Sequence, residues 1–69
     1  MSFARTTEIS ATSEKSFDDA VAQGIARATK TLRHVRAAWI KEQEVTVQND
    51  WISSYKVHML ITFELEGPD

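Results

Sequence analysis

The sequence predicts an α+β protein with the element order strand, helix, strand, strand (β-α-β-β), in a single domain of residues 1–69. One change of pattern and one turn signal indicate this order. Apolar residues recur at helical spacing from Phe17 to Leu32, whereas the residues after His34 alternate as in strands, and a polar Gln-Asn-Asp segment interrupts them. No linker, repeat or low-complexity tract indicates a second unit.

The first strand is predicted at about Phe3–Ser10, a segment rich in Thr and Ile. Ser13 is the expected N-cap of the helix, because its hydroxyl can accept a hydrogen bond from a free amide of the first turn. The helix itself is predicted over about 14–32. Acidic residues near its start and basic residues near its end suit the helix dipole. Its apolar positions are Phe17, Val21, Gly24, Ile25, Ala28 and Leu32.

The second strand is predicted from Val35 to about Val47, and Gln48-Asn49-Asp50 is expected to form a turn because Asn and Asp tolerate positive φ. The last strand has the clearest alternation, from Tyr55 to Leu65, with apolar side chains at the odd-numbered positions. We expect that face to pack on the helix. Gly24 is expected to allow a close approach of helix and sheet.

Sixty-nine residues without a cysteine favour an oligomer. A chain of this size has a marginal core, and disulfides and thiolate metal sites are excluded. Strands of this length also exceed what one helix can cover, so Trp39 and Leu60 are expected on uncovered sheet surface. We therefore expect this chain to associate with copies of itself.

Charge and hydropathy exclude several classes of partner. The net charge is −2 with no basic stripe, which argues against a nucleic-acid partner. No apolar run approaches the ~20 residues of a membrane span. The N-terminus lacks the apolar core of a signal peptide, so a cytoplasmic location without membrane contact is expected.

Catalytic motifs are nearly absent, and we expect a protein that is not an enzyme. His34 and His58 lie in different elements, where contact with the last helix carbonyls and solvation are the simpler interpretations. No serine stands in a Gly-x-Ser-x-Gly elbow. Glu42, Glu44 and Asp50 offer oxygen ligands to a hard cation, but a solvated charged face is the simpler interpretation.

The two tryptophans leave two interpretations open. Trp39 in the second strand and Trp51 beside the turn each offer a large ring on which a small planar ligand can stack. Each also suits an anchor in a subunit interface, where tryptophan is enriched.

The chain resembles the dodecin family over almost its whole length. The resemblance implies a three-stranded antiparallel sheet wrapped around the one helix, assembled into a hollow homododecamer with cubic symmetry. Many members bind and store flavins such as riboflavin or FMN, and binding and storage of a ligand require no catalysis. The matching segments are Ala11-Thr12-Ser13, Ala26-Arg27-Ala28, Thr31-Leu32-Arg33-His34-Val35, Tyr55 with Val57, and Phe63-Glu64-Leu65.

Two departures from the family concern its flavin site. The Trp that stacks on the flavin in flavin-binding dodecins corresponds to Ala37, and the Gln that bonds the ring edge corresponds to Lys56. The resemblance therefore favours a shell that binds flavin weakly or not at all, like the flavin-free dodecins, for some of which calcium binding is reported. The alternative is flavin binding with Trp39 as a stacking residue displaced by ~6.6 Å and Lys56 as donor. The candidate ligand-binding residues are Ala37, Trp39 and Lys56.

Overall fold

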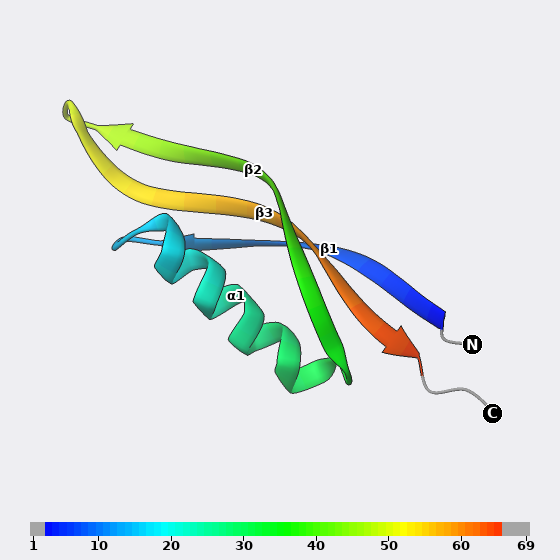
Figure 1. Ribbon diagram of the computed structural model, residues 1–69. Coiled ribbons are helices and arrows are strands. Elements are labelled where there is room, and N and C mark those ends of the chain that lie inside the picture. The colour runs from blue at the N-terminus through cyan, green and yellow to red at the C-terminus, as the bar shows by residue number, and fades with distance from the viewer. Residues whose placement is uncertain (1–2, 66–69) are drawn as a thin grey trace.

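The computed structural model describes residues 3–65. It contains β1 (Phe3–Ser13), α1 (Phe17–Thr31), β2 (Val35–Gln48) and β3 (Trp51–Leu65), in the order that the sequence predicts. The strands form one antiparallel sheet of order β1-β3-β2, so β3 is the central strand and pairs with both others. The helix lies against one face of this sheet (Figure 1).

The prediction that Ser13 caps the helix is wrong. Ser13 pairs with Tyr55 as the last residue of β1, so its backbone belongs to the sheet ladder. The N-cap is Ser16, whose hydroxyl accepts a hydrogen bond from the Asp19 amide at 3.0 Å. β1 is therefore three residues longer than predicted, and the helix begins at Phe17 rather than near residue 14.

The turn between β2 and β3 is confirmed at Asn49 and Asp50. Their φ angles are 51° and 69°. Positive φ at both central residues is the property of the type I′ turn, whose twist matches that of a two-stranded hairpin. Because the turn is this short, β3 begins at Trp51, earlier than the alternation from Tyr55 indicates.

The core lies between α1 and the odd-numbered face of β3, as expected. Val57, Met59 and Ile61 of that face have no exposed surface. Ala20 and Ala28 complete the buried apolar set on the helix side. Gly24 is also buried against this face, since a Cβ placed on it would lie 2.5 Å from the Met59 Cε atom. The expected role of Gly24 in close packing is confirmed.

The sheet is much longer than the helix that covers it. The 15 residues of α1 span about 22 Å, whereas the 15 residues of β3 span about 50 Å, in a molecule measuring 56 × 19 × 13 Å. The hairpin projects beyond one end of α1, and the start of β1 and the end of β3 lie at the opposite end of the sheet (Figure 1). Large apolar side chains are exposed at both ends: Phe3, Val45, Val47, Trp51, Ile52 and Leu65.

Within residues 3–65, no helix is long and apolar enough to cross a membrane.

Candidate functional site

The sheet face opposite the helix carries Ala37 and Trp39. Ala37 pairs with Thr62 and Trp39 with Leu60, and these two β3 residues alternate with the buried residues of the core. Trp39 therefore lies on the same face as Ala37, as expected, and 65% of its surface is exposed. We call the four residues Ala37, Trp39, Leu60 and Thr62 the Trp39 platform. An exposed indole on a sheet face can hold a planar ring by stacking.

One ion pair crosses the sheet beside this platform. The Lys41 ammonium lies 3.0 Å from the Glu8 carboxylate, and Glu8 pairs with Leu60 from the far side of β3. The hydrogen bond to Glu8 raises the pKa of Lys41 above its ordinary value. Sequence reasoning missed this pair because its partners stand on the two edge strands, and the register irregularity between Ile40 and Glu42 is not visible in the sequence.

A second ion pair lies toward the other end of the platform, where Arg36 Nε stands 3.3 Å from Glu64 Oε1. The register is also irregular here, between Val35 and Ala37. The exposed indole is thus placed between two charged pairs. A ligand on the platform would meet a ring face at its centre and hydrogen-bonding groups at its margins.

Lys56 does not join Ala37 and Trp39 within one chain. It pairs with Glu44, six residues along β3 from the Thr62 that faces Ala37, which corresponds to about 20 Å. Glu44 also lies 3.1 Å from His58 Nε2. The hydrogen bond from His58, and to a smaller extent the charge of Lys56, lower the pKa of Glu44. Lys56 therefore belongs to a separate polar cluster.

The carboxylates considered for a cation form no compact ligand set. Glu42 and Glu44 share a strand face, as expected, and line a hollow of about 160 Å³ with Gln43 and His58. Among residues 3–65, however, no group of three or more His, Cys, Asp or Glu side chains is placed to hold a metal ion.

His34 has a structural role through its backbone. It joins α1 to β2 with a φ of 59°, and its carbonyl oxygen accepts a hydrogen bond from the Glu64 amide at 3.0 Å.

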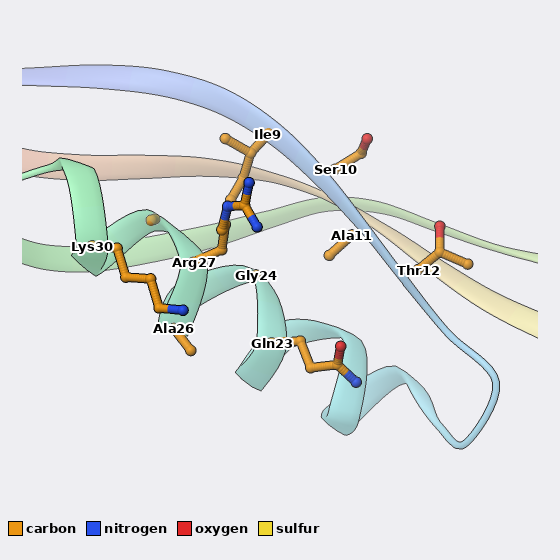
Figure 2. A pocket seen from close by; sticks show the side chains of 10 residues that line it. Ile9, Ser10, Ala11, Thr12, Gln23, Gly24, Ala26, Arg27 and Lys30 are labelled. Atoms are coloured by element: carbon orange, nitrogen blue, oxygen red, sulfur yellow. The ribbon is translucent and has the colours of Figure 1, made fainter.

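A larger groove of about 610 Å³ lies between β1 and α1. Figure 2 shows Arg27 reaching from the helix toward Ile9 of β1, with Lys30 one turn further along. None of the three candidate residues lines it.

Comparisons with a family model, with curated proteins and with solved structures all identify dodecins as similar to this chain. A family model described as Dodecin matches residues 3–66. The dodecin of Thermus thermophilus is 36% identical over 59 residues, covering 86% of each chain. The solved dodecin from Streptomyces davaonensis has 29% identity and a TM-score of 0.91, over 96% of this chain and 97% of that one. The calcium dodecin from Mycobacterium tuberculosis, at 22% identity and a TM-score of 0.81 over 97% and 96%, shares the fold.

Proposed function

This chain belongs to the dodecin family, and on that premise we propose that it forms a hollow homododecamer that sequesters a small ligand without making or breaking bonds in it. The main support for this assembly is the length of the sheet, which leaves apolar side chains uncovered at both ends of the helix. Exposed apolar surface of this kind marks association. Light scattering is expected to give 12 × 7.8 ≈ 94 kDa, and a stable monomer or dimer would contradict the proposal.

We propose further that flavin is bound weakly or not at all. By the register of the resemblance, Ala37 corresponds to the stacking Trp of flavin-binding dodecins, and Lys56 corresponds to the Gln that meets the ring edge. Stacking on an aromatic side chain contributes about 1–3 kcal/mol per ring, by analogy with nucleobases, and Ala37 contributes none of it. That loss corresponds to an affinity about five to a hundred and fifty times lower.

The second candidate is a flavin or similar planar ligand on the Trp39 platform. It is favoured by one observation, the 65% exposure of Trp39 beside Ala37 on the same face. Lys41 is then the nearer cation to the ring edge, since Lys56 lies about 13 Å along β3 from the Leu60 that faces Trp39. A site that used both Trp39 and Lys56 would take them from two copies.

A flavin titration separates the two candidates. Riboflavin and FMN fluorescence are recorded as the purified shell is added, and the protein is then denatured to release any resident chromophore. No quenching and no released flavin are expected. If quenching occurs, Trp39→Ala should abolish it, whereas the control Trp51→Phe, which alters the other indole, should not. Strong quenching that survives Trp39→Ala would contradict both candidates.

A further inference from the structure

Two apolar surfaces lie past the two ends of α1, on the side of the sheet that faces the helix. The hairpin-end surface consists of Val45, Val47 and Ile52, where Ile52 pairs with Val47 beyond the register irregularity between Thr46 and Val47 that changes which β3 residues face the helix. The terminal-end surface consists of Phe3 and Leu65, which pair with each other. Val45 pairs with Tyr55, whose ring contacts Phe17 of the helix at a centroid distance of 5.1 Å, and this contact fixes the side.

Both surfaces are exposed in the single chain. Phe3 and Val47 each expose 59% of their surface, and Ile52 exposes 51%. By contrast, the fully buried apolar set among the described residues contains no side chain larger than Met59. Large apolar side chains thus stay exposed at both ends of the single chain, and covering them with another surface is favourable.

An exposed acidic residue lies at the hairpin end and an exposed basic residue at the terminal end. Asp50 lies at the tip of the hairpin, next to Trp51. Arg5 lies two residues from Phe3 and therefore on the same strand face, opposite Phe63. Both charged side chains are exposed. A contact between unlike ends can place Asp50 of one copy beside Arg5 of another, whereas a contact between like ends brings two Asp50 or two Arg5 side chains together.

We propose that the hairpin-end surface of one copy packs on the terminal-end surface of a second copy, with Asp50 of the first beside Arg5 of the second. This inference rests on the proposed homododecamer and names a contact within it. A contact between two different surfaces is heterologous, and repeated contacts of this kind close into a ring when the rotation allows it. A shell of cubic symmetry contains threefold axes, around which such a ring fits.

A second copy is the occupant that accounts for both surfaces at once. Every chain brings one surface of each kind, so a single repeated contact covers both in equal numbers. A different protein would need two separate complementary sites, or would leave one apolar end exposed.

The test uses complementary variants of the full chain. One carries Val47→Asp with Ile52→Asp, and the other carries Phe3→Asp with Leu65→Asp. Each alone is expected to lose the 94 kDa species (12 × 7.8 kDa) seen by light scattering. Mixed in equal amounts, they should form a species larger than either alone, because the intact terminal end of the first meets the intact hairpin end of the second. A control, Gln48→Asp, places a charge on the other face of the hairpin and should keep the full mass.

Conservative variants guard against simple misfolding. Asp50→Asn keeps a residue that tolerates positive φ, and Arg5→Gln keeps a polar side chain. Each is expected to raise several-fold the protein concentration at which the shell dissociates. Because the two residues are partners in one contact, the double variant should dissociate at no higher concentration than either single variant. Additive effects, or a mixture with no new species, would overturn the proposal. A wild-type monomer would overturn the homododecamer itself, whereas a wild-type shell unaffected by these changes would overturn only this contact.

Discussion

Gly24 of α1 lies directly against Met59 of β3: a Cβ on Gly24 would stand 2.5 Å from the Met59 Cε atom and 3.2 Å from the Ala11 Cβ atom. The helix therefore approaches the sheet at a point where any larger side chain must displace its neighbours. This approach is what buries the odd-numbered face of β3 under a single helix.

Gly24→Val is expected to lower the free energy of unfolding by about 1–3 kcal/mol, the usual cost of overpacking a core. The Met59 side chain can rotate away, but the Ala11 Cβ atom is bonded directly to the β1 backbone and cannot. The control is Gly24→Ala, in which a gain of about 1 kcal/mol in helix propensity offsets the smaller clash. Urea unfolding at one fixed protein concentration measures both. Equal stability of the valine variant would mean that the helix does not approach the sheet this closely.

Ser16→Ala is expected to destabilise the protein by about 1 kcal/mol, because the Asp19 amide loses its capping acceptor. The matched control is Thr12→Ala, a hydroxyl removed from an exposed strand position nearby, which should cost less. Thermal unfolding followed by circular dichroism distinguishes them. If Thr12→Ala were the more harmful change, the helix would not begin where the structure places it.

Stability is expected to fall in acid, partly through Asp19. Hydrogen bonds from Ser13 and then Gln23 lower the pKa of Asp19 below its ordinary value of 3.8. A group with a lowered folded-state pKa stabilises the protein above its unfolded pKa, and this contribution is lost as the pH falls below that value. Urea midpoints measured from about pH 5 down to about pH 2.5 should therefore decrease.

Ser13→Ala removes the largest cause of that shift. Its urea midpoints are expected to vary less steeply with pH over the same range than those of the wild type. An unchanged slope would show that Asp19 titrates normally in the folded protein.

Ala37→Trp combined with Lys56→Gln is expected to create flavin binding, with an affinity gain of about five- to a hundred-and-fifty-fold over the wild type from stacking alone. Quenching of riboflavin fluorescence measures it. Lys56→Gln alone is the control, since it adds no ring. An absence of any gain in the double variant would mean that Ala37 does not line a ligand pocket in the assembled protein.

Much of the fold could be predicted because its signals are local. The helical spacing of Phe17 to Leu32, the alternation before Leu65 and the Asn49-Asp50 turn each act within a few residues. The helix start could not be predicted, since Ser13 and Ser16 are both good caps. Pairing of Ser13 with Tyr55, far along the chain, decides between them.

In the candidate site too, local signals could be predicted and long-range pairing could not. That Ala37 and Trp39 share a face follows from strand geometry, and the structure confirms it. The separation of Lys56 from them follows only from the cross-strand register. The contact of Lys41 with Glu8 depends in addition on the register irregularity near Glu42, which no spacing rule reveals.

The central position of β3 has a consequence for how the chain folds as it is synthesised. Every strand pair in the sheet includes β3, and β3 follows β1 and β2 in the sequence. While the ribosome makes β1, α1 and β2, neither completed strand has a partner. The hairpin is expected to close first, because β2 and β3 are neighbours in sequence, whereas β1 must pair across a long loop. Sheet formation, and with it any contact between copies, therefore waits until β3 has left the ribosome.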